Sequence, residues 1–138
     1  MADKKTAYVG MALSGAPDEF KIVFRRELQD AFSEFSDVEI LDFIGLEKGD
    51  DTEVYIHDKR CAETADLCIF ICDHPSTGMG MEIGFRLKSG KPMICFGHVG
   101  NNITRMVTGM CKVENILFHH YDHVCNIAHA ARAHFGLS

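Results

Sequence analysis

The sequence predicts an α/β protein built on a doubly wound parallel sheet, Rossmann-like or flavodoxin-like, with about five strands and helices on both faces. Two observations lead to this prediction. Short apolar, β-prone runs alternate along the chain with helical stretches. Runs such as "LCIFIC", Leu67 to Cys72, look buried, as strands do in a sheet that is covered on both faces. The 138 residues fit one domain, residues 1–138, without a visible repeat or linker.

The first half of the chain gives two strands and two helices. A strand is expected at Thr6–Leu13, closed by the turn sequence "SGAP". Pro17–Phe35 follows as an amphipathic helix, because its apolar residues recur at spacings of three and four and its first turn is acidic. The run "VEILDF" predicts a strand at Val38–Phe43, and a polar connection leads to a helix from about Glu53 to Ala65.

The second half continues the alternation after the strand "LCIFICD" and a glycine-rich loop. The expected elements are a helix at Met81–Lys88, a strand at Pro92–Gly97, a short helix at Asn102–Met110, a strand at Asn115–Tyr121 and a last helix at Val124–Phe135. Ligands of such sheets bind at the carboxyl ends of the strands. The candidate site therefore involves the loops "ALSG", "DHPSTGMG" and "GHVGNN".

Composition and charge exclude several classes of function. The chain is 46% hydrophobic and 25% charged, as in soluble globular proteins. Its apolar runs are far shorter than the roughly 20 residues that cross a bilayer, and no signal region follows "MADKK", so we expect a cytoplasmic protein without a membrane partner. The formal charge of -6 argues against a nucleic-acid polymer as partner. The six cysteines include no C-x-x-C pair and are expected to be reduced core residues.

The stretch "DHPSTGMGMEIGFRLKSGKP" looks like a phosphate-binding loop with a carboxylate inside it. Gly78, Gly80 and Gly84 follow the third strand with the spacing G-x-G-x-x-x-G, so they match neither a dinucleotide fingerprint nor a Walker A loop. Glu82 is expected in the first helical turn, where the helix dipole favours its ionised form. Such a carboxylate suits attack on a sugar anomeric carbon. The alternative is a plain turn followed by a glutamate that complements the dipole.

A second carboxylate, Asp58, lies in "YIHDKRCAETADLCIF" on the preceding helix. Spacing alone does not show whether it faces the same pocket or only the solvent. Together, "IHD", the "AD" eight residues after that aspartate, a strand, "PSTGMGMEIG" and "GKP" resemble the nucleoside 2-deoxyribosyltransferase superfamily. This superfamily contains deoxyribosyltransferases, 2'-deoxynucleoside 5'-phosphate N-hydrolases and nucleotide N-glycosidases. The resemblance is strong over Asp58 to Pro92.

The resemblance implies roles for the two carboxylates. The residue matching Glu82 attacks C1' of the sugar to give a covalent glycosyl-enzyme, and the residue matching Asp58 handles the proton on the departing base. This is the logic of retaining glycosidases. With water as the acceptor the enzyme is a hydrolase, and with a second base it is a transferase.

The resemblance also concerns the 5' end of the substrate. Ser76 stands six residues before the glutamate, where deoxyribosyltransferases carry an aspartate and the 5'-phosphate hydrolases a serine. The Ser76 hydroxyl and the N–H groups at Gly78 and Gly80 can donate to a phosphate. Thr104 matches a serine that the hydrolases supply from a neighbouring subunit, which implies a homo-oligomer, a dimer or larger, with sites completed across the interface.

One departure weakens the phosphate assignment. In the first loop Ser14, followed by Gly15, stands where the hydrolases carry an arginine. The phosphate would then depend on Arg86, on Arg105 or on another subunit.

Other residues are weighed against plainer roles. Met79 and Met81 could pack against the C2' edge of the sugar, and His74 and His98 could reach base or phosphate at the strand ends. Tyr8 and Phe20 are expected to be core residues rather than stacking platforms. The run "HHYDHVC" (His119 to Cys125) lacks a second ligand pair with zinc spacing, so no metal site is expected.

The predicted function is cleavage of the N-glycosidic bond of a 2'-deoxynucleoside 5'-monophosphate, through Glu82 and Asp58, without a metal or organic cofactor. Two alternatives remain. One is base exchange between 2'-deoxynucleosides with the same two carboxylates, and the other is a non-catalytic nucleotide-sensing module on the same fold.

Overall fold

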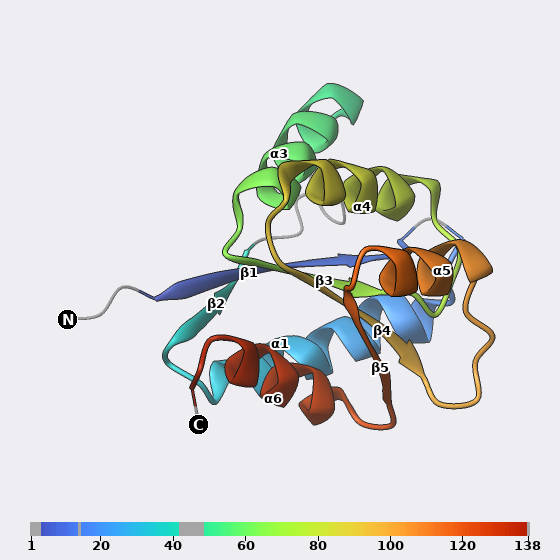
Figure 1. Cartoon of the computed structure of the whole chain (residues 1–138). Coiled ribbons are helices and arrows are strands. Elements are labelled where there is room, and N and C mark those ends of the chain that lie inside the picture. The colour runs from blue at the N-terminus through green and yellow to red at the C-terminus, as the bar shows by residue number, and fades with distance from the viewer. Residues whose placement is uncertain (1–3, 14, 42–48, 138) are drawn as a thin grey trace.

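The computed structural model describes residues 4–13, 15–41 and 49–137 (Figure 1). Its strands are β1 (Lys5–Met11), β2 (Val38–Ile40), β3 (Leu67–Ile71), β4 (Met93–His98) and β5 (Leu117–Tyr121). All pairs are parallel and the order is β2-β1-β3-β4-β5. This is the flavodoxin-like order, and it confirms the predicted fold class.

Helices cover both faces of this sheet. The helical elements of the described residues are η1 (Glu19–Phe24), α1 (Arg25–Ser33), α3 (Asp51–Thr64), α4 (Thr77–Ser89), α5 (Arg105–Val113) and α6 (Val124–His134). Figure 1 shows α3, α4 and α5 on one face and α1 and α6 on the other. No helix in the described part of the chain combines the length and the apolar character needed to span a bilayer.

Three predicted helices differ from the structure at their starts. The short helix expected at Asn102–Met110 begins at Arg105, after its cap Thr104, and ends at Val113. The stretch expected as one helix at Pro17–Phe35 begins as the π-helix η1 and becomes α-helical at Arg25. The helix expected from Met81 begins at Thr77, because the Ser76 side chain caps it and both loop glycines are helical. The strand expected at Val38–Phe43 ends at Ile40 within the described residues, and positions 42 and 43 lie outside them.

The buried strand β3 explains why the core has two halves. Side chains alternate between the faces of a strand. Leu67, Ile69 and Ile71 therefore pack with α1 and α6, while Cys68 and Phe70 pack with the helices of the other face. All six cysteines are free thiols, and five of them are buried as expected, whereas Cys125 is exposed.

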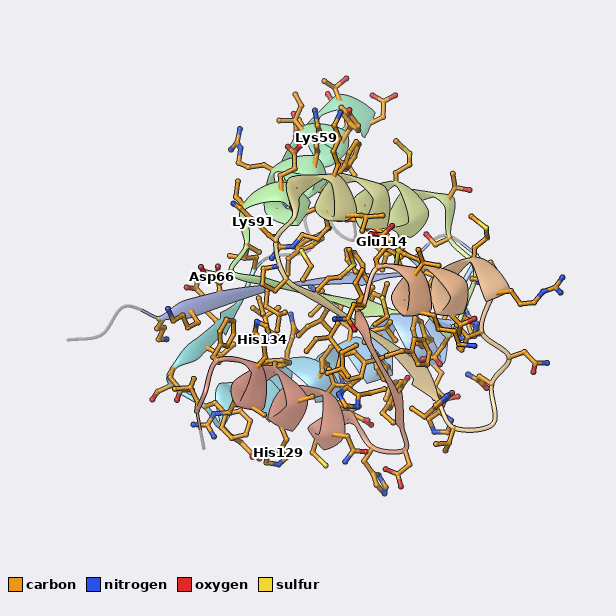
Figure 2. All side chains as sticks on the ribbon, in the orientation of Figure 1. Lys59, Asp66, Lys91, Glu114, His129 and His134 are labelled. Atoms are coloured by element: carbon orange, nitrogen blue, oxygen red, sulfur yellow. The ribbon has the colours of Figure 1, made fainter. Side chains whose placement is uncertain are left out.

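Asp66, from the "AD" of the family motif, has a structural role. Its carboxylate accepts hydrogen bonds from the backbone N–H of Thr6 at 2.8 Å and from the Thr6 hydroxyl at 3.1 Å. The N–H of Thr6 holds the pKa of Asp66 below its usual value. Figure 2 shows Asp66 beside β1, at the edge of the sheet opposite the carboxyl ends of the strands. This motif residue therefore fixes the start of β3 to the start of β1.

Arg86, which the sequence offered as a phosphate ligand, is instead part of the fold. Its side chain is fully buried. Its guanidinium donates to the carbonyl of Pro92 at 2.8 and 2.9 Å and to the carbonyl of Ala62 at 3.2 Å. These bonds link α4 to the end of α3 and to the start of β4, so Arg86 is not available to a substrate.

Candidate active site

A cavity of about 790 Å³ lies at the carboxyl end of the sheet between α3 and α4. Asp58 of α3 and Glu82 of α4 both line it. The sequence left open whether Asp58 faces the glycine loop, and the structure shows that the two carboxylates share one cavity. The other described lining residues are Met11, Leu13, Gly49, Asp50, Asp51, Val54, Tyr55, Lys59, Pro75, Ser76, Thr77, Gly78, Met79, Met81 and Phe85.

Glu82 is the buried carboxylate of the pair, only 9% exposed. The hydroxyl of Tyr8, from β1, donates a hydrogen bond to its Oε2. The pKa of Glu82 is raised to about 7: burial raises it most, the bond from Tyr8 lowers it in part, and the negative charge of Asp58 adds a smaller rise. Tyr8, expected only as a core residue, is therefore part of the site.

The predicted electrostatics of Glu82 are wrong. We expected a first-turn position, where the helix dipole would favour the ionised form. Because α4 begins at Thr77, Glu82 is its sixth residue and lies beyond the first turn. The effect of a helix end falls off within one turn, so burial dominates and favours the protonated form.

Asp58 is the more accessible carboxylate, with 24% of its side chain exposed. The Nδ1 atom of His57 lies 3.2 Å from its Oδ1. An acid that exchanges protons with a departing base or with water must reach solvent, whereas a nucleophile benefits from exclusion of water. The two environments thus suit the two roles.

Gly10, near the carboxyl end of β1, makes room for the Glu82 side chain. A Cβ atom at this position would lie 2.5 Å from Cδ1 of Phe70, which is paired with Gly10 across β1 and β3, and 3.3 Å from Oε1 of Glu82. Nothing in the sequence singled out this glycine, because the run "TAYVGMAL" reads simply as a strand. The contacts that require a glycine here are made by Phe70 and Glu82, which lie 60 and 72 positions further along the chain.

Replacing Gly10 by Ala should therefore displace Phe70 and Glu82 together. We expect a loss of about 1–3 kcal/mol in the free energy of unfolding, from overpacking, and a lower kcat. Urea unfolding and steady-state kinetics measure the two effects. Gly84→Ala is the matched control: its added Cβ atom meets nothing in α4, so it should stabilise the helix by about 0.5–1 kcal/mol. Equal stability for both variants would contradict this account.

Ser76 caps the start of α4 and lines the cavity. Its Oγ accepts a hydrogen bond from the N–H of Met79 at 3.1 Å, which makes it the N-cap. Because the oxygen accepts, the hydroxyl hydrogen can still be donated into the cavity. As in any helix, the first N–H groups, including that of Gly78, have no intrahelical acceptor and can bind an anion.

The remaining residues of the glycine loop differ in whether they line the cavity. Met79 is buried and Met81 is half exposed, and both line the cavity as predicted. Gly80 does not line it, because it is exposed on the outer surface of α4. Its N–H donates to the carbonyl of Ser76 at 3.1 Å.

Four further predicted residues do not line the cavity. His74 and His98 line a separate cavity of about 310 Å³ beside η1. There the His74 ring packs edge to face on Phe20, with the two ring centroids 4.5 Å apart. Gly15 occupies an exposed turn with φ of 81°. Thr104 is exposed and caps α5 through a bond from the N–H of Met106 at 3.3 Å. Ser14 lies outside the described residues.

The charges of the cavity are mostly negative. Asp50 and Asp51 join Asp58 and Glu82 on its wall, and Lys59 is the one cationic side chain among the described lining residues. Arg105 begins α5 and does not line the cavity. Within the described residues no group of three His, Cys, Asp or Glu side chains is arranged to hold a metal ion.

Comparison with known proteins finds relatives in sequence and in fold. No protein-family model matches the chain. A protein of Syntrophotalea carbinolica, provisionally named 2'-deoxynucleoside 5'-phosphate N-hydrolase 1, is 32% identical over 100 residues, covering 70% of this chain and 69% of the relative.

Solved structures that share the fold include two enzymes. One is the CMP N-glycosidase of Clostridium botulinum, with a TM-score of 0.69 and 19% identity over 94% of this chain and 99% of that one. The other is a 2-deoxyribosyltransferase of Leishmania mexicana, with a TM-score of 0.61 and 15% identity over 96% and 99%. The chain belongs to the nucleoside 2-deoxyribosyltransferase superfamily and is an enzyme of the N-glycosidase or deoxyribosyltransferase type.

Proposed function

We propose that the enzyme hydrolyses the N-glycosidic bond of 2'-deoxynucleoside 5'-monophosphates with retention, through a covalent glycosyl-Glu82 intermediate. The observation that carries this proposal is the pairing of a buried carboxylate, Glu82, with a more accessible one, Asp58, in one cavity. The name of the relative from Syntrophotalea carbinolica supports the same substrate class.

The first step forms the intermediate. The Glu82 carboxylate attacks C1', the bond from C1' to the base nitrogen breaks, and the electron pair of that bond moves to the base. Asp58, which reaches the solvent, passes a proton from water to the base. The products of this step are free base, a deoxyribosyl ester of Glu82 and ionised Asp58.

The second step releases the sugar. Ionised Asp58 takes a proton from water while the water oxygen attacks C1', and the ester bond to Glu82 breaks with its electron pair returning to the carboxylate. This yields deoxyribose 5-phosphate, and both groups regain their starting protonation when Asp58 returns its proton to the solvent. Tyr8 stabilises the Glu82 carboxylate in the free enzyme, through the hydrogen bond to Oε2.

The 5'-phosphate is assigned to the start of α4. A phosphate there meets the Ser76 hydroxyl and the free N–H groups of the first turn, including that of Gly78. A carboxylate in place of Ser76 would repel the dianion. We propose further that Thr104 and a cationic group reach this site from a neighbouring copy in a homo-oligomer.

One chromatography experiment tests the function. The protein is incubated with 2'-deoxynucleoside 5'-monophosphates in one mixture, and with 2'-deoxynucleosides plus a second free base in another. Free base and deoxyribose 5-phosphate in the first mixture are the expected result. A new nucleoside in the second mixture, with no cleavage in the first, would overturn hydrolysis in favour of base exchange.

Base exchange is the second candidate, and the charge of the cavity favours it. Four carboxylates and a single lysine line the described wall, and such a wall accommodates a neutral deoxynucleoside more readily than a dianion. Membership of an enzyme superfamily argues against the alternative of a non-catalytic sensor.

Ser76→Asp separates the two candidates without harming the helix. Aspartate caps helices as well as serine does, so we expect unchanged thermal stability. Its charge should lower kcat/KM for monophosphates by about 10- to 100-fold through repulsion at close range, while kcat/KM for free deoxynucleosides stays within about threefold. Ser76→Thr, which keeps a neutral cap, is the control and should keep the preference of the wild type. Equal effects on both substrate classes would place the phosphate elsewhere.

A further inference from the structure

The cavity wall beyond the two carboxylates carries two aromatic rings and one ammonium group. Tyr55 of α3 and Phe85 of α4 meet edge to face, with ring centroids 6.1 Å apart and planes at 69°. The Nζ atom of Lys59 lies 5.5 Å from the Phe85 centroid and 6.0 Å from the Tyr55 centroid. These distances allow cation–π attraction, which positions the ammonium group. All three residues line the cavity, and Tyr55 is 47% exposed.

The two rings lie about one helical turn from the carboxylates, and Lys59 directly follows Asp58. Tyr55 is three residues before Asp58, and Phe85 is three residues after Glu82, so each ring is displaced by about 5 Å along its helix from a carboxylate. Figure 2 shows Lys59 on α3, on the side of the α3 and α4 layer that faces away from the sheet. The two rings, Lys59 and Glu82 all line the same cavity.

The opposite end of the cavity is chemically different. Ser76 lies nine residues before Phe85, which is about 13 Å along the axis of α4. The hydroxyl and the free N–H groups suited to a phosphate are at the Ser76 end, and the rings are at the Phe85 end. A nucleotide with its phosphate at Ser76 and C1' at Glu82 thus presents its base to Tyr55, Phe85 and Lys59.

We infer that Tyr55, Phe85 and Lys59 form the subsite for the nucleobase, and that Lys59 selects bases that carry a carbonyl oxygen; this inference rests on the proposed function. Aromatic faces stack on any base and give no choice among them. Lysine has three donors and no acceptor. It therefore hydrogen-bonds a carbonyl oxygen but opposes an exocyclic amino group, whose hydrogens are also donors.

Lys59 also acts on the bond that breaks. As the C1'–N bond breaks, its electron pair moves into the base, and in a base with a carbonyl group much of this charge resides on the oxygen. An ammonium group beside that oxygen stabilises the departing base before the proton from Asp58 arrives. No described carboxylate forms an ion pair with Lys59, so its charge remains available to the base.

The test compares 2'-deoxyinosine 5'-monophosphate with 2'-deoxyadenosine 5'-monophosphate, whose bases differ in the oxo or amino group at position 6 and in the proton that N1 carries beside the oxo group. Lys59→Met should lower kcat/KM for the inosine compound by about 10- to 100-fold and that for the adenosine compound by less than about threefold. Arg60→Met, the exposed neighbour that does not line the cavity, should change neither value. A uniform loss with both substrates would place Lys59 at the phosphate or sugar and overturn the inference.

A binding measurement distinguishes this inference from the proposed function. Calorimetry should show free hypoxanthine binding the wild type more tightly than the Lys59→Met variant, adenine binding both alike, and Tyr55→Ala weakening both bases. If hypoxanthine binding depends on Lys59 but no nucleotide is cleaved, the proposed function fails and the subsite stands. If nucleotides are cleaved and neither base responds to these substitutions, the subsite is wrong and the function stands.

Discussion

Glu82→Gln should abolish turnover and at the same time stabilise the folded protein. The amide keeps the shape of the side chain and can still accept the hydrogen bond from Tyr8, but it cannot form the glycosyl ester. Loss of a nucleophile typically lowers kcat by about a thousandfold or more. Steady-state assays with a deoxynucleoside monophosphate measure this loss, and full activity in Glu82→Gln or Glu82→Ala would disprove the mechanism.

The gain in stability depends on pH in a defined direction. The pKa of Glu82 rises from 4.5 to about 7 on folding. The folded wild type is therefore most stable below pH 4.5, where Glu82 is protonated in both the folded and the unfolded chain. Stability is then lost as the pH rises through about 7, by up to about 3 kcal/mol at about 1.4 kcal/mol per pKa unit. Glutamine does not titrate and avoids this loss.

Urea unfolding at two pH values measures the effect. The advantage of Glu82→Gln over the wild type should be larger at pH 8 than at pH 5. Glu114→Gln, at an exposed glutamate outside the cavity, should change neither turnover nor the pH dependence. An equal advantage at both pH values would mean that the pKa of Glu82 is not raised by folding.

Tyr8→Phe should move the pH dependence of catalysis to higher pH. The Tyr8 hydroxyl donates to Oε2 of Glu82 and lowers its pKa against the effect of burial. Without this bond the pKa of Glu82 rises above 7, so less of the free enzyme carries the ionised nucleophile at neutral pH. Hydrogen bonds to charged groups contribute about 1.5–3 kcal/mol. We therefore expect at least a tenfold loss of kcat/KM at pH 7, much of it recovered near pH 9.

The control for Tyr8→Phe is a second buried tyrosine that also donates to a carboxylate. Tyr121 bonds Asp73 beside the smaller cavity, away from the carboxylate pair. Tyr121→Phe should leave the rising limb of the kcat/KM profile in place. A Tyr8→Phe profile that falls equally at every pH would mean that Tyr8 positions Glu82 without changing its ionisation.

Local patterns were sufficient to predict the fold. The apolar run at β3 and the periodicity of α3 depend on neighbouring residues, and both elements lie within two residues of the prediction at each end. The start of α4 was missed because Gly78 and Gly80 favour a turn in isolation. The Ser76 cap overrides this preference, and the missed start then led to the wrong position for Glu82 in its helix.

The site depends on contacts that a sequence does not display. Tyr8 and Glu82 are 74 positions apart, and the alternation in β1 does not show that the hydroxyl of one residue meets the carboxylate of the other. His74 was placed in the wrong cavity because, just past the end of a strand, one residue decides which face of the sheet a side chain reaches. Family resemblance identified Glu82 and Asp58, but it gave no indication of Gly10 or Lys59.

The capping bond of Ser76 restricts how this enzyme can evolve. A helix start accepts few residues besides Ser, Thr, Asp and Asn without loss of stability, and Ser76 also forms the cavity wall. Besides the serine itself, the stability of α4 therefore permits two neutral polar residues and one anion at this position. Under the proposed substrate assignment, a single substitution among folding-compatible residues is enough to exchange a phosphorylated substrate for an unphosphorylated one.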